Sequence, residues 1–313
     1  MGFAAVVRDF WMCRGVARSP RDERCAGMSA LQSPTVRRRR LGVELRRLRQ
    51  AAGLTIDDVA CDLDCSDTKI SRIETGKMKA RQLDVRAMLD LYGVADGESR
   101  ERLLQLNREA RIDGWWSGFE DVLPTGFETF VGLEAEAAAL RSYALAVVPG
   151  LLQTEAYARA LFRAGHPDAS AEQVERLVAL RTTRQLLLVR APSPLRLWAV
   201  VDEAVLRRPI GGREVMADQL RAMAELAHQA NVLFQVLPFD KGAHVSLSGM
   251  FTLIEFPNDA DSDVVYVEGA GGNLYLERPR DVREAARAFS RLVAAALDCD
   301  DSRRFILTAA EEL

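Results

Sequence analysis

A short polar segment, residues 67–75, carries side chains well suited to contacts with a partner molecule. Its sequence, DTKISRIET, interrupts the polar positions with Ile70 and Ile73. Isoleucines three residues apart share one face of a helix, so we expect both to point inward. The polar side chains are then left to solvent or a partner: Asp67, Thr68, Lys69, Ser71 and Arg72. Donors, acceptors and charges gathered on one side of a short helix favour hydrogen bonding to a polar partner.

Residues that could perform catalysis or hold a metal are scattered. His166, His228 and His244 stand alone, without metal-ligand spacing or a nucleophile motif. The five cysteines are odd in number and dispersed, which argues against a disulfide framework. Cys61 and Cys65 can share a helix face, yet no histidine or second cysteine pair lies near them in the sequence to suggest zinc. We therefore expect no enzyme, no metal and no cofactor.

Two other patterns that resemble sites have plainer explanations. Asp202 and Glu203 follow an apolar run, where a helix cap is a better interpretation than a pair of catalytic carboxylates. The glycines at 269, 271 and 272 do not follow a strand-to-helix pattern, so they predict a hairpin turn rather than a phosphate-binding loop. His244 lies in a loop that resembles a site, although a plain turn is expected there.

Short helices must position the polar segment. Leucines at 41, 45 and 48 give an amphipathic first helix, which Gly53 ends. Thr55 is placed to cap a second helix, and a turn at Asp64-Cys65 leads to Ser66, which caps the third. Gly76 closes the third helix, and two more helices run to about residue 111. Two short helices joined by a tight turn, the second with exposed polar residues, form a helix-turn-helix arrangement.

Residues 45–76, LRRLRQAAGLTIDDVACDLDCSDTKISRIETG, resemble the lambda-repressor-like (Cro/Xre) family of DNA-binding domains. The resemblance rests on Arg49, Gly53-Leu54-Thr55, the small Ala60, Ile70, and the ending Ile73-Glu74-x-Gly76. It implies an all-α domain whose third helix enters the major groove of double-stranded DNA. It also implies a homodimer that reads an inverted-repeat operator.

The resemblance implies a role for each polar residue. Thr68 and Arg72 are candidates for base edges, because a threonine methyl suits thymine and arginine suits guanine. Asp67 favours capping over a base contact, and Lys69 and Ser71 suit nearby phosphates. Phosphate contacts from the following loop are expected at Lys77, Lys79 and Arg81.

Arg49 and Glu74 match the internal ion pair of the family, which ties the first helix to the end of the third. Residues 37–40, four arginines, are either an arm that contacts phosphates or the minor groove, or a solvated flexible tail.

Two positions depart from the family. Where this chain has Ile56, the family frequently has a glutamine that contacts phosphate. Where this chain has Asp64, the family frequently has a glycine in the turn, and aspartate tolerates the left-handed conformation required there.

Charge separates the chain into a basic and an acidic part. Residues 35–111 have a net charge of +4 and residues 112–313 a net charge of −9. A basic head on an acidic body is typical of a nucleic-acid-binding domain joined to a non-binding one.

We divide the chain into a poorly ordered extension (1–35), a helix-turn-helix domain (36–111) and a regulatory or partner-binding domain (112–313). Residues 1–27 are interpreted as an upstream extension, with the working protein beginning at Met28.

The acidic body is expected to be α+β, with a mixed or antiparallel sheet and flanking helices. Five short apolar runs predict strands: 195–201, 232–237, 250–256, 264–268 and 274–277. Predicted helices lie between and around them: 134–143, 155–164, 171–189, 212–229 and a final helix at 281–297. Trp115 and Trp116, flanked by glycines, mark the junction between the two domains. We expect their rings to pack at this junction rather than to form a platform for a ligand.

The body resembles the uncharacterised C-terminal domain of actinobacterial, antitoxin-like regulators. The resemblance is carried by VPGLLQTEAYARAL (148–161), DEAVLRRPIGG (202–212), LPFDKGAH (237–244), VYVEG (265–269) and LYLE (274–277). It implies a domain that binds a partner or signal, and a small partner protein encoded beside the gene. We expect a cytoplasmic, nucleoid-associated transcriptional regulator without a membrane span. The alternative is an antitoxin-like module that sequesters the small partner and binds DNA only for autoregulation.

Overall fold

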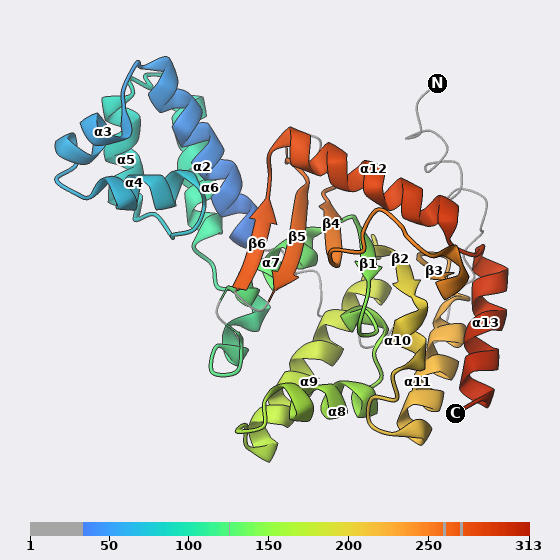
Figure 1. Cartoon of the computed structure of the whole chain (residues 1–313). Coiled ribbons are helices and arrows are strands. Elements are labelled where there is room, and N and C mark those ends of the chain that lie inside the picture. Colours follow the sequence, from blue (N-terminus) through green and yellow to red (C-terminus); the bar gives the residue numbers. More distant parts are fainter. Residues whose placement is uncertain (1–33, 125, 259–260, 270–271) are drawn as a thin grey trace. The chain divides into compact units, whose positions relative to one another are not determined.

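The computed structural model describes residues 34–124, 126–258, 261–269 and 272–313 (Figure 1). Our interpretation of residues 1–27 and of Met28 lies outside these residues, as does most of the extension 1–35 that we expect to be poorly ordered; that expectation is wrong for Pro34 and Thr35, which lie in a helix. The described chain divides into a helical unit, residues 34–118 with Glu128–Glu136, and a second unit, Phe119–Phe127 with Ala137–Leu313. The chain leaves the helical unit at Gly118 and returns to it for Glu128–Glu136.

The helical unit consists of short helices around one core. Its elements are α2 (Pro34–Ala51), α3 (Ile56–Asp62), α4 (Asp67–Glu74), α5 (Gln82–Leu91), α6 (Gly97–Ala110) and the 3-10 turn η2 (Trp115–Phe119). The core is built from fully buried aliphatic residues of these helices, among them Leu45, Val59 and Ile70. All five helices predicted before residue 111 are confirmed, and Figure 1 shows α3 and α4 as the two short helices that follow α2.

The second unit contains a six-stranded mixed sheet. Its strands are β1 (Ala139–Ala144), β2 (Arg196–Asp202), β3 (Val232–Leu237), β4 (Phe251–Glu255), β5 (Val264–Gly269) and β6 (Gly272–Leu276). They lie in the order β3-β2-β1-β4-β5-β6. The strands β1, β2 and β3 are parallel, and β4, β5 and β6 join antiparallel to β1 and to one another. The α+β expectation is confirmed, and the pairing of Gly269 with Gly272 confirms the predicted hairpin.

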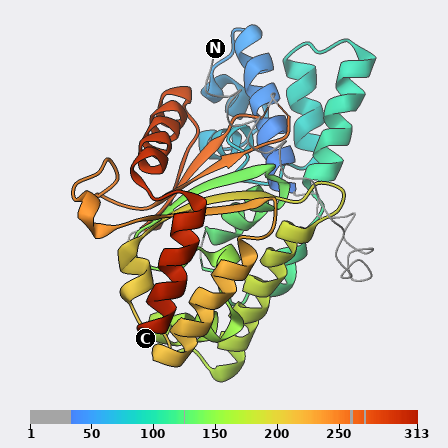
Figure 2. The same ribbon diagram turned by 90° about the vertical axis from the view of Figure 1, so that its right-hand side faces the viewer.

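Helices cover both faces of the sheet. They are α8 (Glu155–Gly165), α9 (Ala171–Gln185), α10 (Glu203–Arg207), α11 (Arg213–Leu226), α12 (Pro279–Ala295) and α13 (Cys299–Glu311), with the 3-10 turns η3 (Gly150–Leu152), η4 (Leu186–Val189) and η5 (Phe239–Lys241). Figure 2 shows α12 on one face of the sheet and α9, α11 and α13 on the other. Phe289 and Leu292 of α12 are buried against Tyr143 and Val200 of the sheet.

Two predictions about the body are wrong. Residues 134–143 are not one helix, because α7 (Phe127–Glu136) ends before the central strand β1 begins. The apolar residues of β1 also fit a helical period, and only pairing with the distant β2 and β4 makes the segment a strand. The helix α12 is not the final one, since α13 follows it and packs on α11 and β3. The buried face of α13 consists mostly of small residues, with Ser302, Ala309 and Ala310, so the sequence shows little hydrophobic periodicity there.

Candidate nucleic-acid interface

The helix α4 presents two different faces. The Ser66 hydroxyl caps it by accepting a hydrogen bond from the Lys69 amide at 3.2 Å. Ile70 and Ile73 are buried in the core of the helical unit. Asp67, Thr68 and Arg72 are exposed, while Ser71 and Lys69 are half-buried. The predicted division into an inward apolar face and an outward polar face is therefore confirmed.

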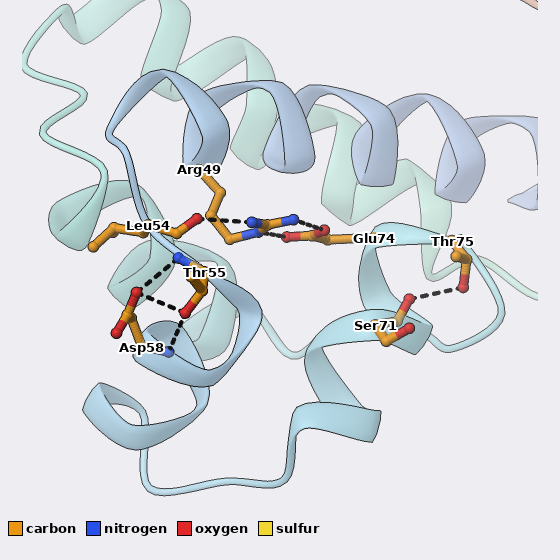
Figure 3. Close-up of polar contacts among 7 residues, drawn as sticks. All are labelled: Arg49, Leu54, Thr55, Asp58, Ser71, Glu74 and Thr75. Carbon is orange, nitrogen blue, oxygen red and sulfur yellow. Dashed lines mark hydrogen bonds and ion pairs between the residues drawn. The ribbon is translucent and has the colours of Figure 1, made fainter.

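The turn before α4 sets the angle between the two short helices. Asp64 has a φ of 47°, and no other non-glycine residue of the described chain has a positive φ. This left-handed conformation is disfavoured for residues with a side chain, and aspartate tolerates it better than most. At the start of α3, Thr55 and Asp58 form a reciprocal capping box, which fixes the entry to the first of the two helices (Figure 3).

A buried ion pair fixes the far end of α4. The Arg49 guanidinium donates to both carboxylate oxygens of Glu74, at 2.6 and 2.9 Å, and to the Leu54 carbonyl oxygen at 2.8 Å (Figure 3). Arg49 is 7% exposed and Glu74 is 5% exposed. The hydrogen bonds to Glu74 raise the pKa of Arg49, against burial, which lowers it. This bidentate pair joins the last turns of α2 and α4, as the family resemblance implied.

Two glycines allow α2 to lie directly against the end of α4. A Cβ at Gly42 would stand 2.4 Å from the Glu74 carbonyl oxygen, and a Cβ at Gly76 would stand 2.8 Å from the Arg39 backbone nitrogen. Gly76 also has a φ of 68°, which favours glycine. The sequence analysis identified Gly76 as a helix terminator and as part of the family pattern, but it did not predict this close approach and missed Gly42. A glycine inside an otherwise amphipathic helix was the available signal for a close helix contact.

The cationic residues expected to contact bases or phosphates differ in whether their side chains already have a partner in the chain. Arg72, Lys77 and Arg81 are exposed, and their side chains have no ion-pair or hydrogen-bond partner within the described residues. Lys69 forms an ion pair with Asp84 of α5 at 3.0 Å, and Lys79 pairs with Asp113. Lys69 and Lys79 must exchange these carboxylates for phosphate in order to contact DNA.

The four arginines before Leu41 are neither a flexible arm nor a flexible tail. Residues 37–40 form the first half of α2, which packs along α6. Arg37 forms an ion pair with Glu109 of α6 at 3.2 Å, and Arg38 donates a hydrogen bond to the hydroxyl of the buried Thr35. Burial lowers the pKa of Arg38, whereas the carboxylates of Glu128 and Asp113 raise it. The helix excludes a flexible arm and a flexible tail, because packing against α6 extends it towards the N-terminus, whereas contacts of these arginines with phosphate stay a prediction.

Comparisons with known proteins agree with this geometry. Residues 40–103 match the family model described as a helix-turn-helix domain, and residues 127–308 match the model described as a domain of unknown function (DUF5753). The chain belongs to the DUF5753 family. No curated protein and no solved structure matches it. A helix-turn-helix domain is a DNA-binding module, so the match indicates a DNA-binding regulator.

Within the DUF5753 domain, a buried polar cluster lies where the parallel strands end. The Tyr143 hydroxyl is 3.3 Å from Oδ2 of Asp202 and 3.2 Å from Nε2 of His244. The Ser246 amide donates to Nδ1 of His244, so in the neutral imidazole the proton lies on Nε2. Burial, and then the Asp202 carboxylate, raise the pKa of Tyr143. The cluster attaches the loop after β3 to the ends of β1 and β2.

The helix cap predicted at Asp202 and Glu203 is formed by Asp202, the last residue of β2. Asp202 caps α10 by accepting from the Ala204 amide at 2.9 Å, and Glu203 accepts from the Phe239 amide at 2.9 Å and from Arg207 at 3.0 Å.

No group of three histidine, cysteine or acidic residues with the geometry of a metal site occurs in the described part of the chain. The model likewise has no helix, among the described residues, with the length and apolar character needed to cross a membrane.

Proposed function

We propose that this chain is a sequence-specific transcriptional regulator that binds double-stranded DNA with α4 in the major groove. The observation that carries the proposal is the position of Arg72. Its guanidinium is exposed on the side of α4 away from Ile70 and Ile73, without a partner among the described residues. A rigid helix that presents an unpaired arginine is suited to the O6 and N7 acceptors of guanine.

The remaining polar residues take supporting roles. Thr68 contacts a thymine methyl group, while Asp67, which accepts a hydrogen bond from the Thr68 amide at 2.6 Å, stays at the helix start. Ser71, Lys77 and Arg81 bind phosphates and set the register of the domain on the duplex. Lys69 and Lys79 also bind phosphates once their ion pairs with carboxylates are broken.

We also propose that two chains bind one operator. A single α4 covers only a few base pairs, so a pair of helices one helical turn apart is needed to reach ordinary specificity. Two-fold symmetry in the protein then requires an inverted repeat in the DNA. Light scattering of the complex tests this step, because two chains per full site are expected. One chain binding an isolated half-site with full affinity would contradict it.

The experiment that tests the proposed function is fluorescence anisotropy of the full chain on DNA. A duplex selected from random sequences by the protein itself is compared with a scrambled duplex across a salt series. We expect a preference of about 10³-fold or more, together with a steep fall of affinity with salt. Equal and weak binding to both duplexes would contradict sequence-specific recognition.

A second candidate function for the DUF5753 domain is binding of a small protein, which includes the antitoxin-like role. It is favoured by three large apolar side chains exposed on the loop between β3 and β4: Phe239, Val245 and Leu247, of which Phe239 and Leu247 are 58% exposed. Large apolar side chains that are exposed on one loop commonly anchor protein partners. Affinity purification of the wild type beside Phe239→Ser/Leu247→Ser tests it, and a partner retained equally by both proteins would exclude this loop.

We propose no reaction for the chain. The histidine that lies nearest to a site-like arrangement, His244, uses both ring nitrogens in hydrogen bonds to Tyr143 and Ser246. Asp202 and Glu203 are occupied by helix-capping and loop contacts. These groups therefore support the attachment of the loop after β3 rather than acid–base chemistry.

A further inference from the structure

The helix α12 concentrates positive charge in an acidic part of the chain. Residues 278–291 contain five arginines and two acidic residues, whereas residues 112–313 as a whole have a net charge of −9. Three of these arginines, Arg283, Arg287 and Arg291, are spaced by four residues, so they follow one side of the helix over about 12 Å. We call these three residues the α12 stripe.

The α12 stripe is exposed and not neutralised. No carboxylate within the described residues pairs with any of its three guanidinium groups. The one acid beside it on the helix surface, Glu284, is engaged by Arg280 at 3.1 Å. Several other arginines of the same unit are paired, among them Arg159 with Glu175 and Arg221 with Asp218. An unpaired row of like charges is unfavourable in isolation and becomes favourable beside an anion.

The opposite face of α12 holds the helix firmly on the sheet. Phe289 and Leu292 are buried, and the Phe289 ring packs edge-to-face on Trp198 of β2 with centroids 5.6 Å apart. Pro279 occupies the first turn, where its missing N–H costs nothing. Figure 1 shows α12 as a continuous helix beside the strands. The α12 stripe is therefore presented by a fixed element, so binding requires no ordering of the backbone that carries it.

We propose that the α12 stripe binds the phosphate backbone of double-stranded DNA that flanks the site held by α4. Guanidinium groups bind phosphate bidentately, and a row of three matches a ligand with repeated charges. None of the large apolar side chains exposed in the described chain belongs to α12, so the stripe lacks the anchors typical of a protein interface. The proposal rests on the proposed function, because DNA already bound by α4 of the same chain is at high effective concentration for α12.

A matched pair of triple variants tests the proposal in the full chain. Arg283→Gln/Arg287→Gln/Arg291→Gln removes the α12 stripe. Arg159→Gln/Arg221→Gln/Arg304→Gln removes the same charge from arginines that are already paired with carboxylates. Each protein is titrated by anisotropy across a salt series with two duplexes, the selected site alone and the same site lengthened by about two helical turns on each side.

On the long duplex, loss of the α12 stripe should reduce the slope of log K against log salt by about 0.9 per lost phosphate contact. The control triple should keep the wild-type slope, and on the short duplex all three proteins should agree. Equal slope changes in both triples, or no change in either, would overturn the inference and leave an acidic protein surface as the remaining partner. Absence of any preference of the wild type for its selected site would instead contradict the proposed function.

Discussion

Arg49 and Glu74 are separated by 25 residues in the sequence and form a bidentate ion pair that is almost completely buried. The pair connects α2 to the last turn of α4, and Arg49 also binds the Leu54 carbonyl oxygen at the start of the turn before α3. One guanidinium therefore links three segments of the helix-turn-helix domain. The orientation of α4, and with it the direction in which Arg72 points, depends on this contact.

Removal of one partner should be more damaging than removal of both. Glu74→Ala leaves the Arg49 cation buried without its carboxylate, so we expect a loss of about 3–5 kcal/mol in the free energy of unfolding. The double variant Arg49→Met/Glu74→Leu replaces the pair with apolar side chains and should lose less. Urea unfolding of the full chain, followed by circular dichroism, measures the transition of the helix-turn-helix domain. Equal losses for the two variants would show that the charge of Arg49 is solvated without Glu74.

Gly42 should not tolerate even a methyl group. In Gly42→Ala the new Cβ meets the Glu74 carbonyl oxygen, so α2 and α4 must separate, at a cost of about 1–3 kcal/mol. We expect a lower melting temperature and weaker DNA binding together. Gly97→Ala is the matched control, because Gly97 is also helical and a Cβ there meets nothing within 4 Å. Since alanine favours helix, Gly97→Ala should be neutral or slightly stabilising, and similar losses in both variants would refute the packing explanation.

Local signals made the helix-turn-helix domain predictable from its sequence. The caps at Thr55 and Ser66 and the left-handed turn at Asp64 depend on residues within a few positions, and all three are present. The Arg49–Glu74 contact is long-range, and it was recognised only through the family resemblance. The periodicity of leucines did not reveal that α2 begins at Pro34, because the first turns carry arginines whose packing on α6 cannot be read locally.

Most individual strands and helices of the body were predictable from the sequence, but the arrangement of the strands in the sheet was less so. Short β-branched runs bounded by turn residues located β2 to β6. The central strand β1 was missed because Leu140 and Tyr143 are three residues apart and fit a helical period, whereas in a strand they face opposite sides of the sheet. Its parallel partner β2 also lies more than fifty residues away. The cluster of Tyr143, Asp202 and His244 was equally hidden, since its members come together only when three strand ends meet.

Asp58 gives the start of α3 a dependence on pH. Hydrogen bonds from the Thr55 hydroxyl and backbone amide hold the pKa of Asp58 below its ordinary value. A depressed carboxylate pKa stabilises the fold above the unfolded pKa of about 3.9, and this contribution is lost as the pH falls through the native pKa. Thr55→Val removes the hydroxyl, so the pKa of Asp58 should rise towards its ordinary value.

Carboxyl NMR titration measures this change directly, and Asp58→Asn identifies the resonance by removing it. The same variant should remove the part of the acid-induced loss of stability that Asp58 contributes. Indistinguishable titrations of the wild type and Thr55→Val would show that the Thr55 hydroxyl does not stabilise the carboxylate in solution, despite the 2.6 Å contact between them.

Arg72 and Lys77 should separate sequence reading from phosphate binding. Both are exposed cations without a partner in the described chain, but Arg72 lies in α4 and Lys77 lies in the loop after it. Arg72→Ala should cost about 1–3 kcal/mol on the selected site and relax the preference at one base pair. Lys77→Ala should weaken binding to every sequence alike and lower the salt slope by about 1.

Selection of DNA sites by each variant, followed by anisotropy on matched and scrambled duplexes, distinguishes the two roles. Either single change removes one positive charge, so the comparison cancels the long-range electrostatic effect on association. Any difference that remains comes from the place of the side chain relative to the base edges. If Arg72→Ala weakens the selected and the scrambled duplex equally, Arg72 binds phosphate and base reading must be assigned to Thr68 and its neighbours on α4.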